Sequence, residues 1–215
     1  MTILLATNNP HKVEEIRAIF APIEGVAVTT LGEVGYDGPE PVEDGTTLEE
    51  NAWIKAKEIH EATGLPVVAD DTGLEVTALD GAPGVWSARY AGDDATYEDN
   101  CRKLVAALDG ADDRTARFRT VICYVDELRT LFAEGEVAGV IEPEGRGDEG
   151  FGYDPIFRPE EQAQTFAEMS DTEKNQISHR GRAVRNFATM LTDYLPDGSL
   201  PEEAAPTGTD NSGGS

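Results

Sequence analysis

The sequence predicts an α/β fold, and three observations lead to that prediction. Residues 3–6 form an apolar run that leads through a polar stretch into a segment with helical periodicity. Residues 47–64 carry helix-start and helix-stop signals and lead into a second apolar run at residues 67–69. Two longer strand-like runs follow at residues 116–125 and 131–140. Strands that alternate with helices in this way are typical of a sheet covered by helices.

The first helix is predicted to begin at residue 10. Asn9 can cap it, and Pro10 suits the first helical position, where an N–H would have no helical partner. Its apolar residues recur at three- and four-residue spacing and predict one buried face: Val13, Ile16, Ile19 and Phe20.

The second helix has signals at both ends. Thr47 and Glu50 match a capping box, and Gly64 is a typical C-terminal stop. The segment after it is predicted to contain two strands, at residues 67–69 and 74–79, joined by a turn at Thr72-Gly73.

The rest of the chain continues the pattern. Residues 81–92 are predicted to form a loop because of their Gly and Pro content. Thr96 and Asp99 are predicted to open a helix. The strands at residues 116–125 and 131–140 are predicted to pair as a hairpin around residues 126–127. Apolar residues mark the buried faces of this helix and of the last one: Leu104, Val105 and Leu108, then Val184, Phe187, Leu191 and Tyr194. Residues 1–195 are expected to form one domain, and residues 196–215 an acidic, disordered tail.

The composition excludes several classes of function. There are 42 acidic and 17 basic residues, so the chain lacks the basic surface that a nucleic-acid polymer requires. No apolar run approaches the roughly 18 residues of a membrane span, and no signal peptide is recognisable, which predicts a cytoplasmic protein. Cys101 and Cys123 show no metal-binding or disulfide spacing. The net charge of −25 and the scarcity of lysine resemble cytoplasmic proteins of extreme halophiles.

The stretch after the first strand suits a phosphate. A helix N-terminus offers free N–H groups and the positive end of the helix dipole. Thr7, Asn8 and Asn9 add side-chain donors, and Lys12 adds a positive charge one turn into the helix. An ordinary capped helix start explains the same residues equally well.

Two acidic pairs stand on either side of the second helix. Glu43-Asp44 precedes it, and Asp70-Asp71 ends the strand that follows it, so both pairs are expected at the same end of the sheet. Mg²⁺ typically binds one or two carboxylates together with substrate phosphates. In so acidic a chain, however, this pattern alone favours a solvated surface over a metal site.

Two further segments combine polar and aromatic groups. Lys174, His179 and Arg180 lie within seven residues of each other and predict a site for a polyanion. In the FGYDPIF segment, Phe151 and Tyr153 can stack on a base and Asp154 can accept a hydrogen bond, although a buried strand end is the alternative.

Six ordered motifs together identify a family. They are ATNNPHKVEEI, VEDGTTLEENAWIKA, VVADDTGLEV, GAPGVWSARYAG, GFGYDPIF and EMSDTEKNQISHRGRA. The chain resembles the inosine/xanthosine triphosphate pyrophosphatases over residues 3–195. The resemblance implies an α/β fold with a long mixed sheet, flanking helices and two lobes around a central cleft. It also implies a homodimer and a Mg²⁺ cofactor.

The resemblance also implies a role for individual residues. Glu43 and Asp71 would bind the metal, Asp71 would act as the general base, and Thr72, where many bacterial relatives carry Ser, would contact the substrate. Phosphate contacts would come from the segment Thr7, Asn8, Asn9, Pro10, His11 and Lys12. The nucleoside would lie against Phe151, Gly152, Tyr153 and Asp154, with Lys174, His179 and Arg180 completing the pocket.

The implied function is hydrolysis of ITP, dITP or XTP to the monophosphate and diphosphate, which keeps deaminated purines out of DNA and RNA. Lys12 and Lys174 would neutralise the triphosphate. Two alternatives are a pyrophosphatase for pyrimidine or methylated nucleotides and a non-catalytic nucleotide-binding module. The ISHRGRA and FGYDPIF segments argue against the first. The two carboxylates at Glu43 and Asp71 argue against the second, since binding alone needs no base.

Overall fold

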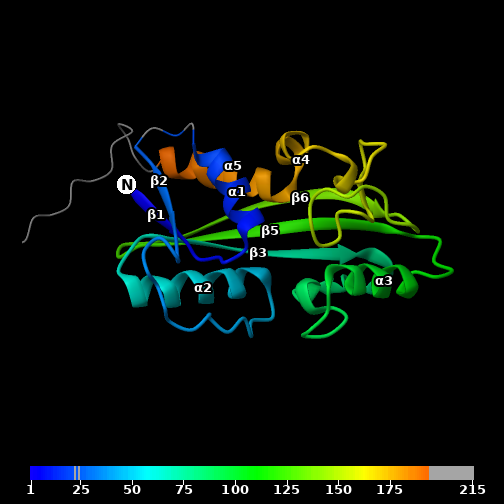
Figure 1. Ribbon diagram of the computed structural model, residues 1–215, viewed down its shortest axis with the longest axis horizontal. Coiled ribbons are helices and arrows are strands. Elements are labelled where there is room, and N and C mark those ends of the chain that lie inside the picture. Colours follow the sequence, from blue (N-terminus) through cyan, green and yellow to red (C-terminus); the bar gives the residue numbers. More distant parts are fainter. Residues whose placement is uncertain (22, 24, 194–215) are drawn as a thin grey trace, which may run out of the picture.

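The computed structural model shows a mixed β-sheet with helices on both faces (Figure 1). It describes residues 1–21, 23 and 25–193 of the chain. The strand order is β2-β1-β3-β5-β6-β7, and a short strand, β4, also pairs with β3. The strands are β1 (Thr2–Leu5), β2 (Ala27–Thr30), β3 (Val67–Val76), β4 (Pro83–Gly84), β5 (Thr115–Val125), β6 (Thr130–Ile141) and β7 (Phe157–Pro159). Strands β1, β2 and β3 are parallel, whereas β5 runs antiparallel to both of its neighbours, β3 and β6. The predicted α/β fold with a mixed sheet is confirmed.

The helices are divided between the two faces of the sheet. Figure 1 shows α1, α4 and α5 on one face and α2 and α3 on the other. Their bounds are α1 (Pro10–Phe20), α2 (Leu48–Thr63), α3 (Tyr97–Ala107), α4 (Asp171–Ile177) and α5 (His179–Asp193). Loops and short 3₁₀ turns connect them to the strands.

Most helix ends follow the sequence prediction. The Asn9 side chain accepts a hydrogen bond from the His11 N–H at 3.0 Å, and Thr96 and Asp99 form both bonds of a capping box. Gly64 ends α2 with a φ of 68°, a left-handed conformation that glycine adopts without strain. The box predicted at α2 is half formed, because the Glu50 carboxylate accepts from the Thr46 N–H at 2.6 Å.

The turn predicted at Thr72-Gly73 is wrong. Strand β3 runs unbroken through these residues, which pair with Thr120 and Arg119 of β5. Gly73 is explained by packing, since a Cβ there would lie 2.8 Å from the Gly84 carbonyl oxygen of β4. The strand predicted to continue to residue 79 ends at Val76, and a 3₁₀ turn follows. Strand β2 and helix α4 were not predicted.

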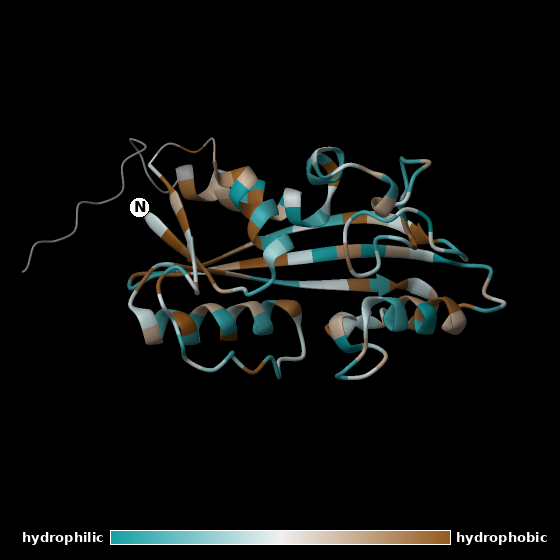
Figure 2. Ribbon diagram, viewed as in Figure 1, coloured by the Kyte–Doolittle hydropathy of each residue, from teal (hydrophilic) through white to brown (hydrophobic). Residues whose placement is uncertain are grey.

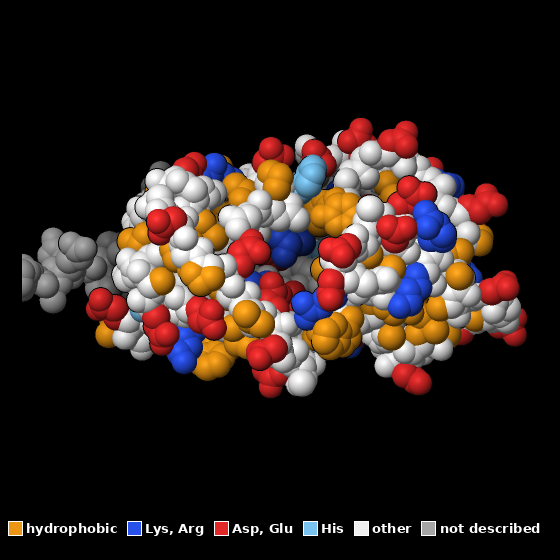
Figure 3. Space-filling view, turned by 60° about the horizontal axis from the view of Figure 1, so that its bottom comes forward, with side chains coloured by type: hydrophobic (Ala, Val, Ile, Leu, Met, Phe, Trp, Pro, Cys, Tyr) orange, Lys and Arg blue, Asp and Glu red, His pale blue; other side chains and the backbone are white. Residues whose placement is uncertain are grey.

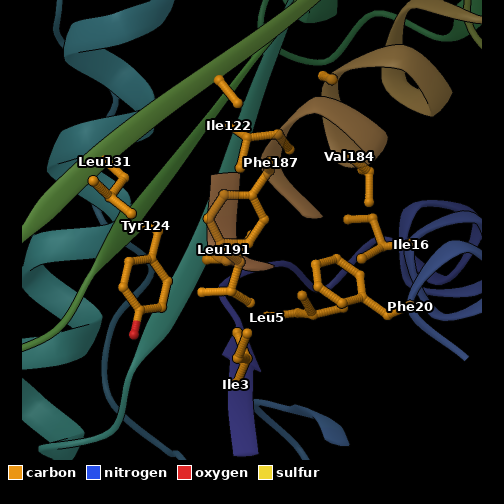
Figure 4. Close-up of a cluster of buried hydrophobic side chains, with 13 residues drawn as sticks. Ile3, Leu5, Ile16, Phe20, Ile122, Tyr124, Leu131, Val184, Phe187 and Leu191 are labelled. Atoms are coloured by element: carbon orange, nitrogen blue, oxygen red, sulfur yellow. The ribbon is translucent and has the colours of Figure 1, made fainter. Parts of the chain in front are cut away.

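The buried core lies on both sides of the sheet. In Figure 4, side chains from β1, α1 and α5 meet those of β5 and β6 in one cluster. The predicted face of the last helix contributes Val184, Phe187 and Leu191 to it. Figure 2 shows hydrophobic residues within the strands and on parts of the flanking helices, with hydrophilic residues along outer loops.

Tyr194 and the predicted tail at residues 196–215 lie outside the described residues. Within the described part of the chain, no helix has the length and apolar character needed to cross a membrane.

Candidate active site

The candidate site lies along one edge of β3, where the sheet is interrupted. Strand β1 pairs with β3 only at Val67 and Val68, and β4 pairs with it at Leu74 and Glu75. Between these two neighbours, residues 69–73 of β3 have no strand partner on that side among the described residues. A cavity opens at this gap and is lined by residues from both faces of the sheet. Figure 3 shows a hollow near the middle of one face of the molecule, with acidic and basic side chains in and around it.

Twelve of the sixteen predicted site residues line this cavity. They are Asn9, Lys12, Glu43, Asp71, Thr72, Phe151, Gly152, Tyr153, Asp154, Lys174, His179 and Arg180. The other four are Thr7, Asn8, Pro10 and His11, which lie in the same loop and helix start as Asn9. Thr7 Oγ1 accepts from the Asn9 N–H, Asn8 binds the Glu40 carboxylate, and His11 stacks on Phe151 at 5.4 Å between ring centroids.

The adjacent aspartates point to opposite faces of the sheet, because successive side chains of a strand alternate. Asp71 faces α2, where its Oδ2 accepts from Asn51 at 3.1 Å and its Oδ1 accepts from the Thr72 N–H at 2.9 Å. Asp70 faces α1 and α5, where it pairs with Lys12 at 2.8 Å and with Arg180 at 3.3 Å. The two negative charges are therefore separated, and each has its own partners.

Glu43 and Asp71 converge on a buried lysine. Lys55 Nζ lies 3.1 Å from Glu43 Oε2 and 3.9 Å from Asp71 Oδ1, and it donates to the Asp70 carbonyl oxygen at 2.7 Å. Burial raises the pKa of the Asp71 carboxyl above its ordinary value; the charge of Glu43 adds to this rise, and Lys55 opposes it.

The donor set at this point fits a magnesium ion that also binds substrate. The described residues contain no group of three or more metal-ligating His, Cys, Asp or Glu side chains, so this is not a closed protein cage. Two converging carboxylates beside an open cavity are the set that Mg²⁺ uses with substrate phosphates.

A row of buried and half-buried charges of alternating sign runs along the other wall of the cavity. In order, its members are Lys12, Asp70, Arg180, Glu15, Lys174 and Asp154. Lys174 lies 3.3 Å from Glu15 and 2.8 Å from Asp154, and Arg180 contacts Glu15 directly. Burial alone would raise the pKa of Asp70, but Lys12 and Arg180 hold it well below its ordinary value. The three cations and three anions balance, so the wall can be buried without net charge.

The Asp154 end of this wall surrounds Phe151. Asp154 accepts from the Phe151 N–H at 2.8 Å, and Lys174 Nζ lies 4.7 Å from the centroid of the Phe151 ring. Tyr153 belongs to the buried core, and its hydroxyl donates to the Ser87 carbonyl at 2.8 Å. Both rings of the segment line the cavity, and that of Tyr153 is also fixed in the core.

His179 begins α5 and is held from two sides. Its Nδ1 lies 2.7 Å from Thr120 Oγ1, and its ring stacks on Phe118 with 4.5 Å between centroids. Burial holds the pKa of His179 well below its ordinary value, and the nearby Arg180 and Lys174 charges lower it further. The imidazole is therefore neutral at physiological pH, with one N–H donor.

Several residues around the site were missed by the sequence analysis, and four of them contact its predicted side chains. Glu15 joins two cations of the charged wall, Asn51 and Lys55 hold the acidic pair, and Thr120 holds His179. Lys55 had a signal, because lysine is scarce in this chain and Lys55 lies in one of the six motifs. Thr120 sits within an apolar strand and had none.

Comparison with known proteins places the chain in a family. The Ham1 family matches residues 3–190. A dITP/XTP pyrophosphatase of Porphyromonas gingivalis is 50% identical over 195 residues, which cover 90% of this chain and 96% of the relative. One from Bacillus licheniformis is 45% identical, covering 88% and 97%.

Solved structures show the same fold. The Ham1 protein of Staphylococcus aureus is 38% identical with a TM-score of 0.81, covering 90% of this chain and all of that one. A HAM1 protein from Coxiella burnetii is 41% identical with a TM-score of 0.82, covering 90% and 99%. On the family match and these identities, the chain belongs to the Ham1 family.

Proposed function

We propose that this protein is a metal-dependent nucleoside triphosphate pyrophosphatase that hydrolyses dITP, ITP and XTP to the monophosphate and diphosphate. The observation that carries the proposal is that Glu43, Asp71 and Lys12 line one cavity with the neutral donor His179. The names of the relatives from P. gingivalis and B. licheniformis support the same substrate class.

The acidic pair supplies the hydrolytic chemistry. Glu43 and Asp71 would hold Mg²⁺, which when bound would neutralise charge on the phosphates. Asp71 would orient a water molecule and accept its proton, helped by a pKa above the ordinary aspartate value. The water oxygen forms a bond to the α-phosphorus, the bond from that phosphorus to the bridging oxygen breaks, and diphosphate leaves with the electron pair.

The charged wall orients the substrate. Lys12 lies at one end of the wall and is positioned to bind the phosphates, whereas Phe151, Lys174 and Asp154 lie at the other end. We assign Lys174 to the nucleoside end. Lys174 is only 3% exposed, and its Nζ is already paired with the carboxylates of Glu15 and Asp154.

Lys12→Ala should weaken binding of ITP more than binding of IMP. The variant loses a charge-assisted contact to phosphate, worth on the order of 1.5–3 kcal/mol, or roughly 10- to 100-fold in Kd. Lys174→Ala should weaken ITP and IMP alike, because Lys174 lies beside Phe151. Calorimetric titration of both ligands into each variant measures the two ratios.

Lys57→Ala is the matched control, because Lys57 is a half-exposed lysine of α2 that pairs with Glu61 and does not line the cavity. It should bind both nucleotides as the wild type does. Equal losses of ITP and IMP affinity in Lys12→Ala would show that Lys12 does not touch the β- and γ-phosphates.

Product analysis tests the proposed reaction. Incubation with ITP, dITP, XTP and dTTP in Mg²⁺ should release diphosphate, not phosphate, from the first three. A non-catalytic nucleotide-binding module would bind ITP and release neither product. A pyrimidine-directed enzyme would prefer dTTP.

Three finer features belong to the same proposal. We infer that the metal is Mg²⁺, that the protein works in the cytoplasm, and that it forms a homodimer. The open two-carboxylate donor set supports the first. Size-exclusion chromatography with light scattering measures the third.

The melting temperature should rise when KCl is raised from about 0.1 M to about 1 M, as the Debye length falls from ~10 Å to ~3 Å. The physical reason is the net charge of −25, whose self-repulsion is screened by salt. Sucrose at equal osmolality is the control for general solute exclusion. A melting temperature that stays flat or falls in KCl would remove the halophilic interpretation.

A further inference from the structure

Two threonine hydroxyls lie in a row between Arg180 and His179 on one face of the sheet. Thr72 of β3 and Thr120 of β5 are directly opposite each other in the antiparallel pair, with 2.7 Å between their Oγ1 atoms. Thr120 is fully buried, and its Oγ1 also lies 2.7 Å from His179 Nδ1. Arg180 Nη2 approaches Thr72 Oγ1 at 3.5 Å. The only role given to Thr120 so far is its contact with His179 Nδ1.

Counting donors and acceptors gives this row of hydrogen bonds a direction. The guanidinium of Arg180 can only donate, so, although its 3.5 Å approach is long, it does not compete for the Thr72 proton. The single Thr72 proton can go to Thr120 at 2.7 Å or to Asp70 at 3.4 Å. Only the first distance lies in the usual O–H···O range. Asp70 Oδ2 in addition already accepts from Lys12 and Arg180.

The direction determines which ring nitrogen of His179 carries the proton. Since Thr120 accepts from Thr72, its own proton is free to go to His179 Nδ1. Nδ1 is then the acceptor nitrogen of a neutral imidazole, and the N–H is at Nε2. The opposite arrangement would leave the Thr72 proton with only the long contact to Asp70.

The Nε2 edge of His179 faces the cavity. Stacking on Phe118 fixes the plane of the ring, and His179 lines the cavity although it is only 4% exposed. Among the described residues, the one buried side-chain nitrogen or oxygen without a partner is Arg89 Nε. His179 Nε2 is not among the buried atoms without a partner and makes no hydrogen bond within the described residues, so it is accessible, and we infer that it is reached from the cavity.

We propose that Thr120 is a positioning residue for purine selection, which together with Thr72 fixes His179 as the Nε2–H tautomer. A fixed donor at the cavity accepts a base edge that presents a carbonyl oxygen and opposes one that presents an amino group. The inference rests on the proposed function for its substrate, but the tautomer itself is a property of the ligand-free protein.

The tautomer is measured directly by long-range ¹H–¹⁵N correlation spectroscopy on protein labelled at histidine. The chain has three histidines, and His179→Gln identifies the signals of the third. The wild type should show a protonated Nε2 and an unprotonated Nδ1. A protonated Nδ1 in the wild type would overturn the proposal, whatever the kinetics.

Thr120→Val and Thr120→Ser form a matched pair for the functional test. Valine keeps the shape but removes the hydroxyl, and serine keeps the hydroxyl. Thr120→Val should mix the two tautomers and lower kcat/KM for ITP by about tenfold, the scale of one hydrogen bond. It should lower kcat/KM for ATP less, so the ITP-to-ATP ratio falls. Thr120→Ser should restore both the spectrum and the ratio.

The outcomes separate this inference from the proposed function. Equal losses for ITP and ATP in Thr120→Val would assign Thr120 a merely structural role and overturn the inference, with the function intact. If the wild type does not hydrolyse ITP, the proposed function fails, and the ligand-free spectrum still decides the tautomer. If Thr120→Val does not fold, the wild-type spectrum and the Thr120→Ser ratio decide; a serine variant that loses discrimination counts against the inference.

Discussion

Replacing Asp71 by asparagine should lower kcat for ITP by at least about 100-fold, the scale of a lost general base. The change removes a carboxylate that lies in the cavity beside Glu43 and Lys55 and that would serve as both metal ligand and base. Steady-state diphosphate release measures the effect. A folded variant that keeps more than about a tenth of wild-type turnover would show that the base lies elsewhere.

The structure supplies controls for this experiment. Asp44 is exposed and lies next to Glu43 in the same loop, so Asp44→Asn should keep wild-type activity while Glu43→Gln loses it. The pair also decides which of the two adjacent acids is the ligand. Because burial raises the pKa of Asp71, its charged form is costly to fold, and the asparagine variant should keep its melting temperature.

The wild type should hydrolyse ITP with a kcat/KM at least about 100-fold higher than that for ATP, because a site built for one hydrogen-bonding pattern rejects a mismatched base. Inosine presents a carbonyl oxygen at position 6, where adenine presents an amino group. His179 and Arg180 supply donors on that wall of the cavity. Parallel measurement of ITP, GTP and ATP separates position 6 from position 2, since guanine shares the carbonyl.

Comparable hydrolysis of ATP and ITP would reject the assigned substrate class. The comparison is best made with the wild type. Arg180→Ala, though it should lower ITP turnover, would also leave Asp70 and Glu15 without a counter-charge in a buried wall. Loss of activity in that variant would not distinguish base recognition from damage to the wall.

The sequence predicted those features whose causes are local. Asn9 and Thr96 cap helices through bonds to residues two or three positions away, and both caps are present. The turn at Thr72-Gly73 was wrong because glycine was interpreted as a local breaker, whereas Gly73 is determined by the approach of β4. Conformations set by a neighbouring strand leave little trace in the residues themselves.

The candidate site was predicted through its motifs, but its connections were not. Glu15 meets Arg180 across 165 positions of sequence, and Thr120 meets His179 across 59. Neither residue type is unusual where it stands, so no local pattern marks it. The separation of Asp70 from Asp71 does follow from strand alternation, once β3 is known to be continuous.

The gap along β3 lets a single strand present both of its faces to one substrate. Asp71 lies on the face of α2, with the acidic pair, while Asp70 and Thr72 lie on the face of α5, with the donors proposed to read the base. The contacts between the two groups run through the backbone of β3, where the Thr72 N–H donates to Asp71 and the Asp70 carbonyl accepts from Lys55. The choice of base can therefore change in evolution through residues on one face while the hydrolytic groups on the other stay in place. A pocket built from one face alone would force both functions to change together.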